Sequence, residues 1–187
     1  MISKYELVNY NNKTGLWQIK ALISFNNIKA GDLGGWIEKE SNLAHDGDCW
    51  IYDNAKVYGD ATVFDNAEVY GDAKVFENAE VYGDAEVFDK ALVYGHAWIY
   101  NNAKVFDKAM VYGDAMIFNN AKVYGDATVC GNAEVYGDAM IFNNAEVYGN
   151  ARVFENAEVY DVAWVYGHAK VGGDAKIGGN ATVFNDV

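Results

Sequence analysis

The chain has 187 residues, of which 14 are Lys or Arg and 27 are Asp or Glu, so its formal net charge is −13. It is 51% hydrophobic and contains no proline, a balance typical of a folded domain and not of a disordered acidic tail. Such negative charge argues against direct binding of nucleic acid. Its apolar runs are too short for a membrane span, and no leader indicates export. Two cysteines indicate no disulfide framework and a cytoplasmic location.

The N-terminal 50 residues show no regular period. Residues 5–8 and 16–25, joined by the turn-rich sequence NYNNKTG, predict a β-hairpin. The sequence FNNIKAGDLGGWIEKESNLAHDGDCWIYDNA then leads into a regular repeat. We expect residues 1–50 to cap the first turn of that repeat, with Trp17, Trp36 and Trp50 as an apolar plug and His45 as a further cap residue.

From Ile51 onward the sequence repeats every six residues without an insertion. An aliphatic residue stands at the same place in 23 consecutive units, from Ile51 to Val183, and an alanine stands two residues before nearly every one. Alternation along a short strand turns these two residues to one side and places Tyr or Phe on the other. A Gly-Asp or Asp-Asn pair follows, and these residues tolerate the left-handed backbone that a tight corner needs.

The unit V-x-G-D-A-x resembles the hexapeptide repeat of left-handed parallel β-helices. That resemblance implies an all-β triangular solenoid with three hexapeptides, about 18 residues, in each coil and about seven to eight coils in total. We therefore expect one continuous structural domain, with a hairpin and capping segment at residues 1–50 and the β-helix at residues 51–187. The sequences KAGDLGGW and GDCWIYDNA are similar to the N-terminus of a family of bacterial and phage hexapeptide-repeat proteins, whose members are named acetyltransferases or polymer-forming proteins. A phage or prophage origin and a bacterial host cytoplasm follow from the resemblance.

Many left-handed β-helices are acyltransferases, so the resemblance also implies an alternative enzyme that uses acyl-coenzyme A, with His96 as its base. His96 and His168 replace Asp or Asn at two corners and fall on the same edge of the predicted coil. A general base needs a cleft and an orienting partner. Because no insertion interrupts residues 51–183, we expect no loop that could build such a cleft and no catalytic residue.

Neither a metal ion nor a cofactor is expected. Calcium needs six to eight converging oxygens, whereas the Asp and Asn corners of this repeat predict outward side chains in single file. Cys49 stands where other units have an inward alanine and is expected to be buried. Cys130 stands where most units have Tyr or Phe, so we expect an exposed thiol without a base beside it.

One predicted surface carries an unusual run of uncharged side chains. Folded on an 18-residue coil, one outward column reads Lys56, Lys74, Leu92, Met110, Thr128, Glu146, Trp164. Further apolar side chains lie around the corner next to it. Exposed apolar patches rich in Tyr, Trp and Met typically mark protein contacts. The predicted protein-binding residues are Leu92, Tyr94, Trp98, Tyr100, Met110, Tyr112, Met116, Phe118, Cys130 and Trp164.

The last coil predicts a second contact, through Val183, Phe184 and Val187, by β-pairing with another copy. We therefore expect a homodimer or a higher homo-oligomer. Residues 51–187 hold 9 basic and 21 acidic residues, so an acidic rod could also occupy a basic groove that normally binds nucleic acid.

Three hypotheses about function stay open. The favoured one is a non-catalytic protein-binding or assembly module, most specifically a phage-encoded inhibitor that covers a host defence protein or nucleic-acid-binding protein. The other two are the acyltransferase and a self-assembling structural protein.

Overall fold

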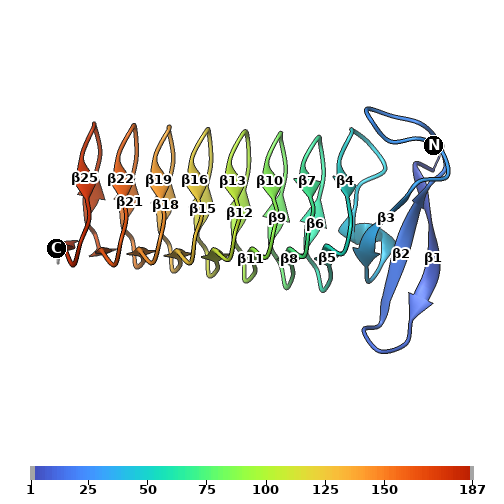
Figure 1. Ribbon diagram of the computed structural model, residues 1–187, viewed down its shortest axis with the longest axis horizontal. Coiled ribbons are helices and arrows are strands. Elements are labelled where there is room, and N and C mark those ends of the chain that lie inside the picture. Colours follow the sequence, from blue (N-terminus) through green and yellow to red (C-terminus); the bar gives the residue numbers. More distant parts are fainter. Residues whose placement is uncertain (1–2, 186–187) are drawn as a thin grey trace.

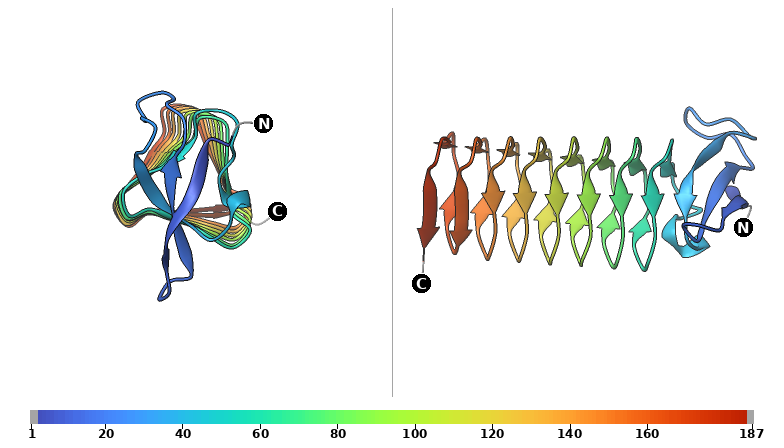
Figure 2. Two further views of the ribbon diagram at one scale, coloured as in Figure 1. Left: turned by 90° about the vertical axis from the view of Figure 1, so that its right-hand side faces the viewer. Right: turned by 60° about the horizontal axis from the view of Figure 1, so that its bottom comes forward.

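The computed structural model describes residues 3–185 and shows an all-β rod with a hairpin at its N-terminal end (Figure 1). Each coil consists of short strands separated by corners, and each strand pairs in parallel with the next strand of its sheet, as Leu92 does with Met110. Seen down the rod, the coils superpose as a triangle (Figure 2). The predicted parallel β-solenoid and its hairpin cap are confirmed.

Three sheets form the sides of the rod, which we call faces 1, 2 and 3. Face 1 belongs to an 11-stranded sheet and holds β5 (Lys56–Val57), β8 (Lys74–Val75), β11 (Leu92–Val93), β14 (Met110–Val111), β17 (Thr128–Val129), β20 (Glu146–Val147), β23 (Trp164–Gly167) and β26 (Thr182–Asn185). Face 2 is a 7-stranded sheet of β6 (Thr62–Val63), β9 (Glu80–Val81), β12 (Trp98–Ile99), β15 (Met116–Ile117), β18 (Glu134–Val135), β21 (Arg152–Val153) and β24 (Lys170–Val171). Face 3 is an 8-stranded sheet of β4 (Trp50–Ile51), β7 (Glu68–Val69), β10 (Glu86–Val87), β13 (Lys104–Val105), β16 (Lys122–Val123), β19 (Met140–Ile141), β22 (Glu158–Val159) and β25 (Lys176–Ile177).

The interior of the rod is filled by the two inward residues of each unit. Every alanine and aliphatic residue of this pattern from Ala55 to Val165 is fully buried. One small and one branched side chain per strand fit a narrow triangular core, because three strands of a coil must approach one another closely. The coil therefore buries apolar surface only by stacking on its neighbours.

The corners depend on a backbone conformation that most residues avoid. The first corner residue has a positive φ in every unit from Asp53 to Gly179, as in Asn101 (φ 59°) and Gly113 (φ 74°). At Gly113, an added Cβ would lie 2.9 Å from the backbone nitrogen of Gly131 in the next coil. Glycine thus serves both the left-handed conformation and the close stacking of this corner.

The outward aromatic residues form columns of stacked rings along the rod. The rings of Phe88 and Phe106 lie 4.8 Å apart and are parallel, and the same arrangement recurs on all three faces. At the C-terminal end, two columns stop at Gly172 and Gly178, and the ring of Phe154 lies where a Cβ of residue 172 would stand. The stacked rings therefore add side-chain contacts to the backbone pairing between coils.

The cap begins with the predicted hairpin. Strand β1 (Tyr5–Asn11) pairs antiparallel with β2 (Leu16–Ala21), and β2 pairs antiparallel with β3 (Leu33–Ile37). Strand β3 then pairs in parallel with β5, and Leu43 bridges to Val63. The chain thus already follows the path of a coil before Ile51, whereas the division at residues 50 and 51 stays a prediction from sequence.

The plug that covers the first coil differs in part from the three tryptophans we expected. Trp50 is buried, but its buried partners are Tyr5, Ile19 and Ile37. Trp17 and Trp36 are only half-buried. The register pairs Trp17 with Ile37 and Gln18 with Trp36, so the two indoles lie on opposite sides of the sheet and cannot form one plug. Lys4 is also buried, and its ammonium donates to the carbonyl oxygen of Cys49 at 3.0 Å.

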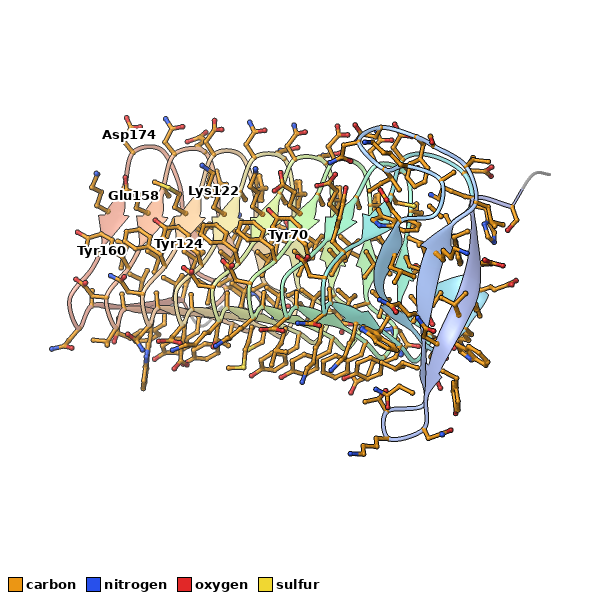
Figure 3. All side chains as sticks on the ribbon, turned by 45° about the vertical axis from the view of Figure 1, so that its right-hand side comes forward. Tyr70, Lys122, Tyr124, Glu158, Tyr160 and Asp174 are labelled. Atoms are coloured by element: carbon orange, nitrogen blue, oxygen red, sulfur yellow. The ribbon has the colours of Figure 1, made fainter. Side chains whose placement is uncertain are left out.

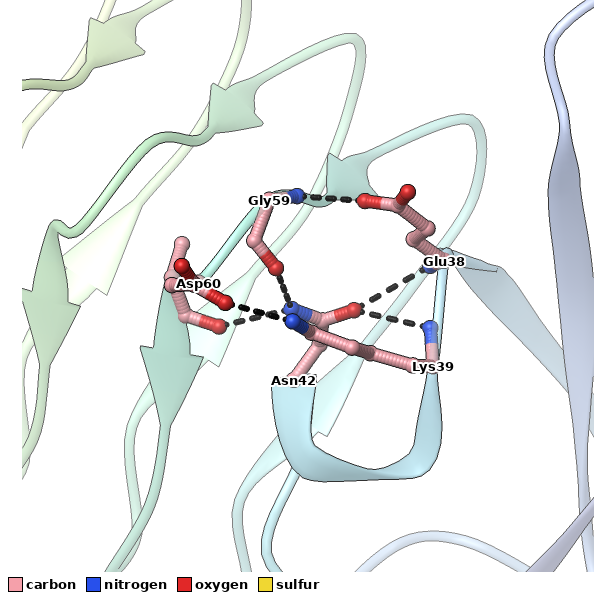
Figure 4. A network of polar contacts seen from close by, with 6 residues as sticks. Glu38, Lys39, Asn42, Gly59 and Asp60 are labelled. Atoms are coloured by element: carbon pink, nitrogen blue, oxygen red, sulfur yellow. Dashed lines mark hydrogen bonds and ion pairs between the residues drawn. The ribbon is translucent and has the colours of Figure 1, made fainter.

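A short helix, η1 (Glu40–Asn42), fastens the cap to the coils. The buried amide of Asn42 donates to the carbonyl oxygens of Gly59 (3.0 Å) and Ala61 (2.8 Å) and accepts from the backbone nitrogen of Lys39 at 2.9 Å (Figure 4). Lys39 also pairs with Asp60 at 2.5 Å. Within residues 3–185, no helix is long and apolar enough to cross a membrane.

The ring columns yield a stability prediction. Replacing Gly172 with Tyr should extend one column, because the backbone there is not left-handed and the ring of Phe154 can move back to the 4.9 Å spacing of Phe118 and Tyr136. We expect the free energy of unfolding to rise by about 0.2–1 kcal/mol, measured by thermal denaturation. The control, Gly173→Tyr, places the same side chain at φ +66° and should lower stability by about 1–2 kcal/mol. Effects of equal sign would contradict this account.

Candidate protein-binding surface

Each face presents two outward columns, one of strand residues and one of rings. Figure 3 shows Tyr70, Tyr124 and Tyr160 in one row along face 3, with Lys122 and Glu158 in the neighbouring row. The register of the strands fixes both columns, because each outward residue lies beside the one 18 positions later. An outward residue that differs from the repeat consensus therefore has a defined position along the rod and on one face.

Several charged side chains on face 3 are paired within the chain. Glu86 accepts from the hydroxyl of Tyr70 at 2.7 Å and from Lys104 at 2.7 Å, and Lys176 pairs with Glu158 at 3.0 Å. Burial, and then the hydrogen bond to Glu86, raises the pKa of Tyr70. The outward strand positions of the solenoid thus accept paired charges without loss of the coil.

Faces 1 and 2 carry apolar residues at the same two coils. Leu92 lies beside Met110 on face 1, and Trp98 lies beside Met116 on face 2. Trp98 is 42% exposed. We call these four residues, with the rings that follow them in the chain (Tyr94, Tyr100, Tyr112 and Phe118), the apolar window.

Charged and polar residues of the neighbouring coils bound the apolar window. On face 1 the neighbours are Lys74 on one side and Thr128 followed by Glu146 on the other. On face 2 they are Glu80 and Glu134. The window therefore spans two coils and wraps around the corner between faces 1 and 2.

Nine of the ten predicted protein-binding residues meet at this window. The rings of Tyr94 and Tyr112 are stacked at 4.8 Å, and those of Tyr100 and Phe118 at 5.0 Å. Cys130 follows Tyr112 in its column, and hydrogen bonding to Cys130, then burial, raises the pKa of Tyr112 to about 12. The tenth residue, Trp164, is 46% exposed but lies beyond Thr128 and Glu146, so the structure does not join it to the window.

A groove borders the window on face 2, which the sequence analysis did not identify. It has a volume of about 690 Å³ and runs along the corner past Trp98 and Met116. Its remaining lining is polar, and half of these residues are acidic: Asp60, Thr62, Asn78, Glu80, His96 and Asp114. Corner and strand residues from successive coils form it together, so only the 18-residue fold of the sequence could have indicated it.

The three histidines occupy two different structural environments. His96 and His168 both stand at corners between faces 1 and 2, and their backbone nitrogens donate to the next coil at 2.8 Å. Both side chains are exposed, and His96 lines the acidic groove. His45 lies in the cap, where its ring stacks on Tyr5 at 4.3 Å and its Nδ1 accepts from the backbone of Lys4.

Comparison with known proteins adds a partial similarity. No family model matches the chain. An "uncharacterized acetyltransferase YdcK" of Escherichia coli K12 is 50% identical over 42 residues, which are 22% of this chain and 13% of that protein. The repeat, the stacked sheets and this similarity agree on the fold. The chain is a hexapeptide-repeat β-solenoid. The similarity covers only a small part of the relative, so the relative's activity is not transferred with it.

The C-terminal coil of the solenoid exposes part of its core. Val183 is partly buried, and Phe184 is 56% exposed although its ring stacks on Tyr166 at 5.4 Å. Val187, the third predicted contact residue, lies outside the described residues. Among residues 3–185, no three His, Cys, Asp or Glu side chains are grouped to hold a metal ion.

The two cysteines of the chain are expected to differ sharply in reactivity. Cys49 is buried, and burial raises the pKa of its thiol, whereas Cys130 is partly exposed. In dilute native protein a maleimide should modify Cys130 at least about 100-fold faster than Cys49, which needs local opening to react. Mass spectrometry of the labelled peptides measures both rates, and Cys130→Ser should remove the fast phase. Equal rates would contradict the burial of Cys49.

Proposed function

We propose that this solenoid is a non-catalytic protein-binding module that docks through the apolar window. The observation that carries the proposal is that Leu92, Met110, Trp98 and Met116 occupy equivalent outward positions on two adjacent faces of the same two coils. On both faces, the strand pair at these two coils carries apolar side chains where other pairs carry charged ones. The four side chains therefore form one contiguous surface. Large apolar and aromatic side chains of this kind are enriched in the centres of protein interfaces.

The fold does not require these residues to be apolar. At the same height on face 3, the equivalent positions hold Glu86 and Lys104, which form an ion pair at 2.7 Å. The inward aliphatic residues of these coils are valine on faces 1 and 3 and isoleucine on face 2, and all are fully buried. Since charged pairs serve the coil equally well, the apolar side chains of the window are best explained by a contact outside the chain.

On face 2, the groove that contains Asp60, Glu80 and Asp114 beside the window favours a basic partner. Residues 51–187 carry 9 basic and 21 acidic residues, and a field of one sign steers oppositely charged proteins toward the rod. The most specific form of this proposal is a phage-encoded inhibitor that covers a basic surface of a host defence or nucleic-acid-binding protein. Val183 and Phe184 at the C-terminal coil offer a second contact for assembly with another copy.

The half of the window on face 1 can be disrupted with two like charges. Leu92→Glu with Met110→Glu places a carboxylate at both positions, as Glu68 and Glu86 do at neighbouring positions on face 3. We expect this variant to fold and to lose association with itself or with a captured partner by at least about 100-fold, because several buried apolar contacts are lost together. Light scattering coupled to size-exclusion chromatography measures the mass across concentration.

The matched control reverses the ion pair at the same height on face 3. Glu86→Lys with Lys104→Glu also changes two charges at the same two coils and keeps the window, so it should associate as wild type does. Association that survives the window variant, or that is lost equally in the control, would contradict the proposal. Growth of filaments with concentration in both variants would instead support a self-assembling structural protein that uses the end contact.

An acyltransferase is the second candidate, and two observations favour it. The partial relative carries the name acetyltransferase, and His96 lines the groove of about 690 Å³. Turnover of acetyl-coenzyme A with a panel of amine and hydroxyl acceptors tests it. His96→Asn keeps a residue that other corners use, and His168→Asn is its control at the same edge. We expect no turnover. Turnover that only His96→Asn abolishes would replace the binding module by the enzyme.

A further inference from the structure

The outward column of face 1 has an order of residue types that is complementary to its own reverse. From the cap onward, the strand register places side by side Trp36, Lys56, Lys74, Leu92, Met110, Thr128, Glu146 and Trp164. From Trp36 to Trp164 the column thus holds an indole and two positive charges, then two apolar side chains, then a hydroxyl, a negative charge and an indole. Beyond Trp164 it continues with Thr182. Its midpoint lies between Leu92 and Met110, in the apolar window.

We propose that face 1 binds a second copy of this chain in an antiparallel arrangement, with a two-fold axis parallel to its strands between β11 and β14. The inference rests on the proposed function, because it names the partner of the window on this face. Under this symmetry Leu92 meets Met110 of the second copy, and Lys74 meets Thr128. Lys56 meets Glu146, and Trp36 meets Trp164. Each contact occurs twice, as a two-fold interface requires.

The charges concerned have no counterpart within the chain. Lys56, Lys74 and Glu146 form no ion pair with any residue of the described range 3–185. Lys56 and Lys74 are adjacent cross-strand neighbours, and like charges in that position repel. A carboxylate from a second copy relieves this repulsion, and the antiparallel register supplies one opposite Lys56.

The hairpin shapes the end of the same face. It extends past the side of the rod that carries β5, β8 and β11 (Figure 1) and beyond the triangular outline of the coils (Figure 2). The angle between hairpin and face forms a cleft of about 320 Å³, lined by Thr14, Leu16, Glu38, Lys56, Tyr58 and Lys74. The proposed register brings the exposed Trp164 of the second copy to this end of the face. Trp164, which lies outside the window in its own chain, thereby gains a place in the interface.

The ring column of face 1 is also compatible with this arrangement. It is interrupted at Cys130, where a thiol replaces a ring between Tyr112 and Tyr148. The reversed register sets Phe76 opposite Cys130 of the second copy, so a large side chain faces the smallest member of the column. Tyr94 faces Tyr112 at the centre.

The other two faces do not show this self-complementarity. On face 2, the same operation about Trp98 and Met116 sets Glu80 against Glu134, two carboxylates that repel. On face 3, the central coils hold the ion pair of Glu86 and Lys104 instead of apolar side chains. Face 2 therefore keeps its half of the window free for another partner.

The expected interface is small. Eight coil levels at about 4.8 Å and a strand width of about 13 Å give on the order of 500 Å² per copy, so the total of about 1,000 Å² is at the lower limit for a specific complex. We therefore expect a dimer with a dissociation constant in the micromolar range, and association must be followed over that range of concentration.

A reciprocal charge exchange tests the register. Lys56→Glu alone and Glu146→Lys alone should each weaken the dimer by at least about 10-fold, because the two-fold axis doubles every like-charge contact. Combining Lys56→Glu with Glu146→Lys should restore wild-type dimerisation, measured by analytical ultracentrifugation. In one chain these two positions are five register steps apart, so rescue cannot come from an ion pair within the chain.

Crosslinking tests the same geometry independently. In a Cys130→Ser background, Lys56→Cys with Glu146→Cys should yield a covalent dimer with a short bismaleimide, since the two positions are about 24 Å apart within one chain. The control, Glu68→Cys with Glu158→Cys, has the same spacing on face 3 and should stay monomeric under the same treatment.

The outcomes separate the inference from the proposed function. A dimer that Leu92→Glu with Met110→Glu dissociates, but that the charge exchange does not rescue and the cysteine pair does not crosslink, overturns the antiparallel register and leaves the window as the binding surface. A wild type that is monomeric throughout the micromolar range, yet binds a partner through the window, overturns this inference alone. Loss of neither association nor partner binding in the window variant overturns the proposed function as well.

Discussion

The parallel pairing of each strand with the strand 18 residues later is the constraint on which the rest of this protein depends. It satisfies backbone groups such as the nitrogen of Tyr94, which donates to Val111 in the next coil at 3.0 Å, and it aligns identical side chains in columns. Inward columns can then hold only alanine and a branched residue, because the three sides of the triangle are close together. Corners must accept a positive φ at the same place in every unit from Asp53 to Gly179. Ring stacking follows from this spacing, since about 4.8 Å between strands is also a favourable separation for parallel, offset rings.

The same constraint leaves the outward strand positions free to vary. Glu86 and Lys104 on one face and Leu92 and Met110 on another support equivalent strand pairs at the same height. The type of side chain at such a position therefore indicates what the rod contacts, because the fold itself accepts either type. The apolar window, the unpaired Lys56 and Lys74, and the acidic groove beside Trp98 are departures from the repeat of this kind. A binding surface built this way needs no loop, because neighbouring coils hold its side chains in place.

Most of the candidate site followed from the sequence once the period was known. Counting 18 residues placed Leu92 beside Met110 and Trp98 beside Met116, and the structure has both pairs. Counting did not reveal the groove at the corner, which depends on how far the side chains of Asp60, Glu80 and Asp114 stand out from the backbone. It also misjudged the plug, where Tyr5, Ile19 and Ile37 do what was expected of Trp17 and Trp36. The cap has no sequence period, so its inward-facing and outward-facing residues could not be assigned from the sequence.

The sequence by itself determined the coil, its faces and the residues in each column, because a strict six-residue period allows one assignment of inward side chains. Only the tertiary structure decided how the first coil is closed, through the buried Lys4, the hairpin and the amide of Asn42. It also decided that the hairpin overhangs face 1 and forms a cleft beside Lys56 and Lys74. The physical reason is that repeats specify contacts between equivalent residues, whereas caps, grooves and clefts arise from contacts between residues that have no equivalent elsewhere in the chain.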